Sequence, residues 1–502
     1  MKSFTARPAR AGPGRPRLEA IAVGLALLAT GCAVGPDFHR PATATGDRYT
    51  SGALPAQTAA TDIAGGSAQH WAAGQDIPAQ WWKAFHSEAL DKLIEQAFAA
   101  NPSVQSAQAA LRQANDLVAA QRGFFAPTVQ ASFAVSRQKN PVGTLSPTLT
   151  SGVPVFNLYT SQLSVGYTLD VFGGNRRQVE SLLAQAQMQR FQLEATYITL
   201  STNVVTAAVQ DASLRAQIAA TERMVLLETE QVQIMQRELE LGAIADADVT
   251  AQQVLLAQTA ALLPPLRKQL AVQRDALCAL LGLLPWQDPG ETFDLARLEL
   301  PPELPLSLPS RLVEQRPDVR AAEAQLHAAS ANVGVAIANM LPQVTFQASL
   351  GGTSTAFGQM FSEGDKFWSL GTNLSQTLFA GGTLYYRKKA AVDALDQAGA
   401  EYRSAVLTAF QNVADTLQAL VFDAEALKAD LEAEHSAEKS LAYARGAHEL
   451  GSLSYLALLN AEQAYQQAVV NRVQAQANRY ADTAALFQAL GGGWWNRDQA
   501  RQ

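Results

Sequence analysis

The chain repeats itself at an interval of 215 residues, from Asn101-Pro102 to Arg316-Pro317. The positions that follow keep this offset and the same residue type in six pairs: Val104 and Val319, Ala107 and Ala322, Leu111 and Leu326, Ala114 and Ala329, Pro127 and Pro342, Val129 and Val344. After its second proline each segment changes from a helical apolar period to alternation, so the duplicated unit is a helix followed by a strand. A duplication of this length indicates an architecture rather than a chemistry confined to one pocket.

Composition and motifs exclude several classes of function. Of the 502 residues, 48% are apolar and only 17% are charged, and a net charge of -7 with scattered Lys and Arg argues against nucleic-acid binding. The six histidines are too dispersed for a metal site, and nucleophile elbows and phosphate loops are absent from the sequence. We therefore predict no enzyme activity, catalytic residue, metal or cofactor. His327 and Cys278 are interpreted as packing residues.

The N-terminus has the pattern of a bacterial lipoprotein signal. Residues 1–31 carry a basic stretch and a short apolar run from Ile21 to Ala29, and the small residues before Cys32 form a cleavage site. Cys32 would then be lipidated and become the mature N-terminus, and Ala33 after it, rather than Asp, favours the outer membrane over the inner membrane. An ordinary secretory leader with an incidental cysteine remains the alternative.

Two pairs of alternating runs predict β-hairpins at 128–171 and 343–379. Each run places apolar residues on one side and polar residues on the other, which is typical of outer-membrane strands. No stretch after the leader has the length of a transmembrane helix, so any insertion into a bilayer must use these strands.

Long helices are predicted over 176–240 and 384–450, where proline is absent. At 1.5 Å per residue each would be on the order of 100 Å long, too long for one globular core to bury, so they should pack lengthwise against partner helices. Gly242 and Gly451 end them, and return helices follow over 246–281 and 454–490. Pro264-Pro265 should kink or interrupt the first return helix. A further helix is expected from about Ser87 to Phe124.

These elements define a domain plan. It comprises the signal peptide 1–31, an extended N-terminal segment 32–86, a first repeat 87–285, a linker 286–307, a second repeat 308–490 and a tail 491–502.

Four strands are too few to close a barrel, and open edges in lipid leave backbone groups unpaired. Three copies of the chain would supply about twelve strands, enough for a water-filled pore, whereas two would supply roughly eight and leave no lumen. We therefore expect an α+β membrane protein: a homotrimer with a twelve-stranded β-barrel, continued by a long periplasmic α-helical barrel.

Several motifs carry a family resemblance. They are Cys32-Ala33-Val34-Gly35-Pro36-Asp37-Phe38, Trp81-Trp82-Lys83-Ala84-Phe85, Ala279-Leu280-Leu281-Gly282-Leu283-Leu284-Pro285, Gly491-Gly492-Gly493-Trp494-Trp495 and, most specifically, the stretch from Leu308 through Arg316-Pro317-Asp318 to Glu323. The chain resembles the outer membrane factors of bacterial tripartite efflux systems, in their TolC/OprM-like, NodT-type lipoprotein branch. The resemblance implies a trimeric exit duct for small molecules, with a periplasmic adaptor protein and an inner-membrane RND transporter as partners.

The resemblance also implies a periplasmic gate just after the helix turns. The matching positions are Asp246, Asp248, Tyr455, Leu456, Leu459 and Asn460, and the adaptor-contacting turns are Gly242, Ala243, Gly451 and Ser452. A carboxylate is frequent in the second turn of such proteins, where Asn460 or Ala457 stands here, so the acidic ring would move to Asp248. The alternative is that Asp246 and Asp248 only cap the return helix.

Three other functions remain to be weighed. A lipid-anchored coiled-coil scaffold has no use for two-faced strands, and a lipid-anchored hydrolase lacks a catalytic constellation. Within the channel class, the outer-membrane component of a type I protein secretion system is the alternative to an efflux duct.

Overall fold

The computed structural model describes residues 33–42, 48–139 and 155–497, and it divides into two compact units. The strand unit comprises residues 1–40, 113–186 and 324–400. The helical unit comprises residues 41–112, 187–323 and 401–502. Each repeat of the sequence contributes to both units. The predicted signal peptide and Cys32 lie outside the described residues.

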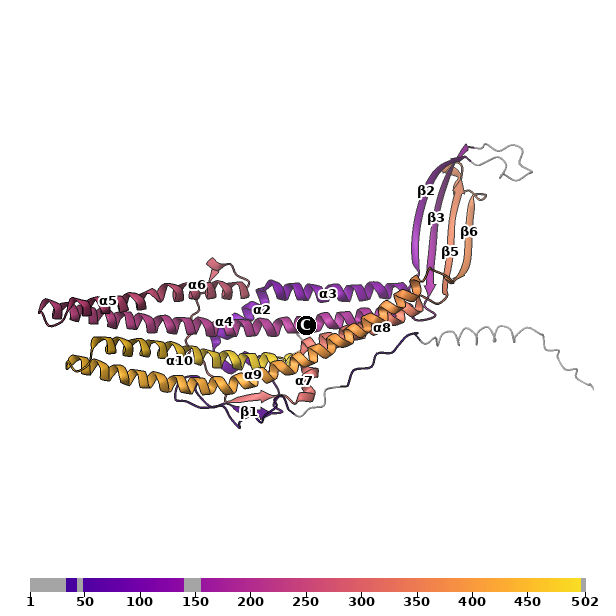
Figure 1. Cartoon of the computed structure of the whole chain (residues 1–502). Helices are drawn as coiled ribbons and strands as arrows, with labels where there is room; N and C mark the ends of the chain where they lie inside the picture. Colours follow the sequence, from indigo (N-terminus) through magenta and orange to yellow (C-terminus); the bar gives the residue numbers. More distant parts are fainter. Residues whose placement is uncertain (1–32, 43–47, 140–154, 498–502) are drawn as a thin grey trace, which may run out of the picture. The chain divides into compact units, whose positions relative to one another are not determined.

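The strand unit contains one antiparallel four-stranded sheet. Its order is β2-β3-β5-β6 (Figure 1), with bounds Thr128–Lys139, Val155–Leu169, Gln343–Ser354 and Lys366–Ser375. The first repeat supplies β2 and β3, the second supplies β5 and β6, and the two central strands join the repeats. Helices α3 (Pro102–Arg122) and α8 (Pro317–Ala338) lead into the two hairpins, and the 67-residue helices α4 (Gly174–Glu240) and α9 (Thr383–Glu449) leave them.

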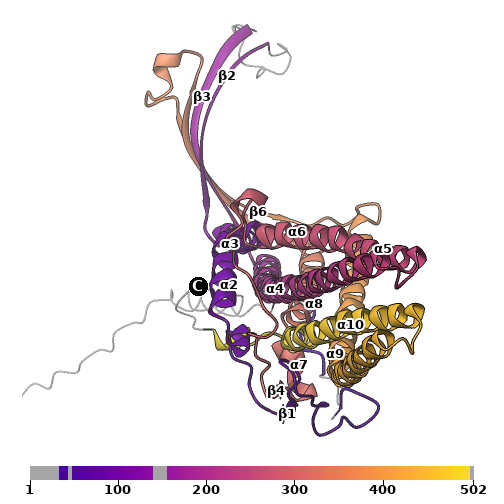
Figure 2. The ribbon, with the colours of Figure 1, turned by 90° about the vertical axis from the view of Figure 1, so that its left-hand side faces the viewer.

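The helical unit contains the distal parts of α4 and α9 together with the return helices. In Figure 2, α5 (Asp246–Ala261) and α6 (Leu263–Leu280) lie along α4, and α10 (Tyr455–Ala489) lies along α9. Shorter helices α2 (Glu88–Ala100) and α7 (Pro309–Gln315) precede α3 and α8. None of the helices in the described ranges combines the length and the apolarity that a membrane crossing requires.

Prolines set the helix boundaries. The helix expected from Ser87 to Phe124 is in fact two helices, because Asn101 before Pro102 is extended at φ -65° and ψ 126°. Arg316 before Pro317 is extended in the same way. The ring of a proline clashes with a preceding helical residue, which explains both breaks. Pro264 lies in the first turn of α6, so the first return helix is interrupted as predicted.

Each repeat makes the same kind of contact at its own break. The Asn101 side-chain amide donates to the carbonyl of Leu280, the last residue of α6, at 2.8 Å. The Arg316 guanidinium donates to the carbonyl of Ala489, the last residue of α10, at 3.0 Å. Each side chain therefore satisfies an otherwise unpaired helix-terminal carbonyl.

Two glycines allow the backbone after each return helix to come close to the backbone just before the break. Gly282 and Gly491 both have left-handed backbones, with φ of 71° and 97°. A Cβ at Gly282 would lie 2.6 Å from the Ala100 carbonyl oxygen, and one at Gly491 would lie 2.7 Å from that of Gln315. The same backbone-to-backbone packing thus recurs in both repeats, and only glycine permits it.

Two further strands, which the sequence did not predict, lie outside the four-stranded sheet. β1 (His70–Ala73) and β4 (Glu303–Leu306) form a small parallel sheet, so the described part of the chain contains six strands. It joins the N-terminal segment to the linker between the repeats. The N-terminal segment continues into a buried aromatic core. There the ring of Trp81 stacks on that of Phe487 with ring centroids 5.2 Å apart, and the ring centroids of Phe85 and Tyr480 are 6.4 Å apart.

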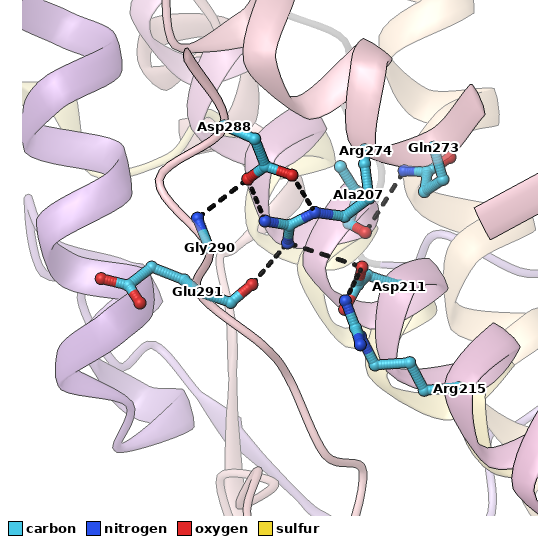
Figure 3. A network of polar contacts seen from close by, with 8 residues as sticks. All are labelled: Ala207, Asp211, Arg215, Gln273, Arg274, Asp288, Gly290 and Glu291. Carbon is cyan, nitrogen blue, oxygen red and sulfur yellow. Dashed lines mark hydrogen bonds and ion pairs between the residues drawn. The ribbon is translucent and has the colours of Figure 1, made fainter. Parts of the chain in front are cut away.

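A charged network fastens the linker to the helices (Figure 3). The buried Arg274 of α6 donates from Nε to Asp288 at 2.9 Å, also bonds the Glu291 carbonyl, and lies 3.6 Å from Asp211 of α4. Arg215 holds the other oxygen of Asp211 at 2.7 Å. The hydrogen bond from Arg274 keeps the pKa of Asp288 below its ordinary range. The start of the linker is therefore tied to α6 and, through Arg274, to α4.

Candidate functional site: a two-faced sheet and paired helix turns

The strand register separates an apolar face of the sheet from a polar face. Cross-strand neighbours on the apolar face are Val129, Ala131, Phe133 and Val135 of β2, Leu163, Val165, Tyr167 and Leu169 of β3, Val344, Phe346, Ala348 and Leu350 of β5, and Trp368, Leu370 and Leu374 of β6. Trp368 and Leu370 are each 77% exposed within one chain. An apolar face of this size on a soluble surface would be a liability, so it requires an apolar environment.

The opposite face carries polar side chains that pair across the strands. Thr160 and Thr353 are linked by their hydroxyls at 3.0 Å, and Ser349 and Ser369 at 2.7 Å. The outer edges of β2 and β6 have no strand beside them in the described part of one chain. A sheet with one apolar face, one polar face and two open edges is suited to a barrel wall completed by other copies.

The long helices end in two matching turns. The N–H of Gly242 bonds to Leu239 O at 2.9 Å and that of Ala243 to Glu238 O at 2.8 Å. In the second repeat Gly451 and Ser452 make the equivalent pair of bonds, to His448 O and Ala447 O. This is the Schellman pattern, which needs a left-handed residue, and the glycines have φ of 73° and 71°.

One apolar cluster joins the turns of the two repeats. It consists of Met235 of α4, Val249 of α5, Leu441 and Ala444 of α9, and Tyr455 and Leu458 of α10. All four helices therefore contribute to the same core at this end of the helical unit, which we call the tip.

The predicted gate residues fall into three groups at the tip. Tyr455 is 7% exposed and packs beside His448, and Leu459 lies against the same cluster. Asp246, Leu456 and Asn460 are exposed, and Leu456 is 67% exposed. Asp248 is half-buried in the first turn of α5, where it accepts the Ala245 N–H at 3.3 Å. Asp248 therefore has a capping contact, while Asp246, Leu456 and Asn460 present free surface.

Sequence reasoning missed three buried polar residues beneath the tip. Glu228 of α4, Gln252 of α5 and Glu462 of α10 are 1%, 0% and 2% exposed. Glu228 lies on the same helical stripe as the buried Met224, Val232 and Met235, so a carboxylate at an apolar-stripe position is the signal that could have found it.

The segment that follows Cys32 is held in the strand unit. Arg177, at 4% exposed, donates to Asp37 at 2.7 Å, to Glu180 at 2.8 Å and to the Val34 carbonyl at 3.1 Å. The His327 ring stacks on Phe38 at 4.3 Å and lies 2.9 Å from Glu180, so it has the packing role predicted for it.

Comparison with known proteins places this fold and these elements in a family. Residues 93–283 and 308–492 match the outer membrane efflux protein family. The pyoverdine export outer membrane protein OpmQ of Pseudomonas putida is 30% identical over 84% of this chain and 89% of its own length. The toluene efflux pump outer membrane protein TtgC of Pseudomonas putida is 28% identical over 95% of this chain and 96% of its own length.

Solved structures agree in fold. The outer-membrane channel OprN matches with a TM-score of 0.81 at 27% identity, covering 92% of this chain and 100% of the OprN chain. The CmeC outer membrane channel of Campylobacter jejuni matches with a TM-score of 0.82 at 20% identity, which concerns the fold alone. The chain belongs to the outer membrane efflux protein family. It is therefore an outer-membrane channel component of an efflux system.

Proposed function

We propose that three copies of this chain form the exit duct of a tripartite efflux pump, with a twelve-stranded barrel in the outer membrane and a helical barrel in the periplasm. The observation that carries the proposal is the four-stranded sheet with two open edges and two chemically distinct faces. In hydrocarbon each unpaired edge group costs several kcal/mol, so β2 of one copy pairs with β6 of the next. The apolar face then meets lipid and the polar face lines water.

The partners follow from the family resemblance and from the tip. An adaptor protein of the periplasm would contact the paired turns at Gly242, Ala243, Gly451 and Ser452, and an inner-membrane RND transporter would supply the energy. Relatives are named for pyoverdine, toluene and antibiotics. Because such different cargoes share one kind of outer duct, we place cargo selection in the transporter.

A lipid anchor at Cys32 would complete the attachment to the outer membrane. The segment beginning at Ala33 is bound by Arg177 next to the start of α4, which would keep the lipid close to the strand unit. The lipoprotein pattern of residues 1–31 supports this anchor.

Channel formation is tested by reconstituting the purified protein in planar bilayers. We expect ion conductance, together with an SDS-resistant trimer whose gel migration changes on boiling. A lipid-anchored scaffold would give neither signal. A monomer in mild detergent without conductance would contradict the proposal.

The gate is tested with Asp248→Asn. Three Asp248 carboxylates around a threefold axis would attract cations, so the variant is expected to lower block by divalent cations. Asp246→Asn removes the same charge from the other candidate gate position in the first turn of α5, so comparing the two variants assigns the effect to one carboxylate. Unchanged conductance and block in Asp248→Asn would leave this residue only its capping contact with Ala245.

The partners are tested by site-specific crosslinking in cells. Photoreactive side chains at Ala243 and Ser452 avoid the left-handed glycines beside them, where a side chain would be strained. We expect capture of a periplasmic adaptor and co-purification of an RND transporter. Recovery of an ABC exporter instead would favour the type I secretion alternative.

A further inference from the structure

Below the tip, a small polar cluster is enclosed by the four helices. Glu228 comes from α4, Gln252 and Thr259 from α5, Arg445 from α9 and Glu462 from α10. Glu228 and Glu462 are almost fully buried, which is rare for carboxylates unless they are paired.

The partners of this cluster satisfy only part of it. Thr259 donates to one oxygen of Glu228 at 2.9 Å, and Arg445 donates to one oxygen of Glu462 at 3.3 Å. The second oxygen of each carboxylate and the Tyr455 hydroxyl have no hydrogen-bond partner among the described residues. The side-chain amide of Gln252 is fully buried and lies close enough to Glu462 to lower the pKa of that carboxyl. Two buried carboxylate oxygens without a hydrogen-bond donor in one cluster favour a proton on one of the two carboxyls.

The electrostatics point to Glu228 as the proton carrier. Burial raises the pKa of Glu228 to about 7, and the charge of Glu462 adds to this while Thr259 and Arg445 oppose it. Burial also raises the pKa of Glu462, and the hydrogen bond and charge of Arg445, together with Gln252, offset only part of this rise. Arg445 is partly exposed and therefore a weak counter-ion for a second carboxylate. The other ionisable groups facing the cluster are Tyr455, near both glutamates and Asp248, and His448, which packs on Tyr455.

We propose that Glu228, buried in the same cluster as Glu462, is a proton-binding site that controls packing of the tip: protonated Glu228 holds the four helices together, and ionised Glu228 loosens the turns. The site needs no cavity, because a proton occupies none. The consequence for channel opening rests on the proposed function, in which the tip is the periplasmic gate. The loosening of the turns on ionisation of Glu228 does not depend on the proposed function.

The sign follows from linkage between protonation and packing. The ordinary pKa of this carboxyl is 4.5, and the packed tip raises it to about 7. The packed tip thus binds the proton more tightly than a loosened tip, in which Glu228 is solvated. Its stabilisation is complete below about pH 4.5 and is lost as the pH rises through about 7. An acid periplasm therefore keeps the tip packed.

The test uses the purified full-length channel with a nitroxide spin label at Ala243→Cys, an exposed turn position. We expect label mobility to rise between pH 5.5 and 8 with a midpoint near 7. Glu228→Gln, a permanently neutral side chain, should hold the label at its low mobility across this range. Glu462→Gln removes the repelling charge and should move the midpoint to more acid pH, which a purely structural role would not do.

A matched control excludes a second titrating pair. Burial and Asp423 raise the pKa of Asp482 to about 7, and Asp482 is 20 residues further along α10 than Glu462, about 30 Å at 1.5 Å per residue. Asp482→Asn should leave the midpoint of the Ala243 label unchanged. A wild-type label without a pH response, or a Glu228→Gln variant that keeps the wild-type midpoint while remaining an SDS-resistant trimer, would overturn the inference.

Conductance of the same samples separates the two proposals. A channel that conducts while its label ignores pH would reject the proton site and leave the duct intact. A label that responds to pH in a protein that never conducts would reject the duct and leave the proton site intact.

Discussion

Leu163→Arg is expected to abolish assembly in the outer membrane. Leu163 lies at the middle of β3 on the apolar face, between Ala131 and Leu350 on the neighbouring strands, and is 45% exposed in one chain. In the proposed trimer this side chain meets lipid near the bilayer midplane. An arginine there costs about 2–4 kcal/mol per strand and so about 6–12 kcal/mol for three copies. That range is comparable to the whole free energy of unfolding of a typical domain.

Ser164→Arg is the matched control for this prediction. Ser164 is the next residue on the same strand and belongs to the polar face, paired with Gln130 and Ser349. An arginine there would enter the water-filled interior, so we expect normal amounts of trimer and a change in conductance only. The measurement is the amount of heat-modifiable trimer in outer-membrane fractions. Equal loss of trimer in both variants would show that the faces are assigned wrongly or that the sheet does not contact lipid.

The sequence was informative where one period holds over many residues. Alternation in β3 and β5 gave both hairpins, and the long proline-free stretches gave helices within two residues of α4 and α9. Such patterns predict secondary structure well because every turn of a helix, or every second residue of a strand, again places an apolar side chain on the same side. The strand ends were predicted less accurately: β6 ends at Ser375, whereas the hairpin was expected to reach residue 379.

The missed features depend on contacts between distant segments. β1 and β4 are four residues each and separated by more than 200 positions, so neither contains enough alternation to be recognised. The docking of the segment 33–40 depends on Arg177. The sequence around Arg177 looks like the exposed start of any helix. Glu228 was missed because glutamate is common on solvated helix faces. Only the buried apolar residues on the same helical stripe show that this glutamate is buried.

The duplicated Asn-Pro and Arg-Pro sites illustrate the same limit and allow a test. Alignment of the repeats marks Asn101 and Arg316 as equivalent, but not what they bond. Both cap the end of a return helix, at Leu280 and Ala489. Arg316 also pairs with Asp318 at 2.6 Å, and part of this pair is exposed to water.

We expect Arg316→Met to lower the stability of the helical unit by about 1.5–3 kcal/mol, the usual value for a hydrogen bond from a charged group. Methionine keeps much of the packing volume but leaves the buried Ala489 carbonyl without this donor. The Asp318 carboxylate is partly exposed and can be hydrated, so its loss of a partner adds little. Asn101→Ala should cost about 1–3 kcal/mol, because it removes the bond to Leu280 and the cap of the Ser103 N–H.

Thermal unfolding of the detergent-solubilised trimer, followed by circular dichroism, checks both variants. Each should lower the melting temperature by a few degrees, whereas Arg297→Met, on the exposed surface of the linker, should change it little. If Arg316→Met and Asn101→Ala both melt like the Arg297 control, the shared contact of the repeats is geometric only. A lower melting temperature in only one of the two variants would mean that both repeats keep the same backbone path but that only one of the two side chains, Asn101 or Arg316, contributes to stability.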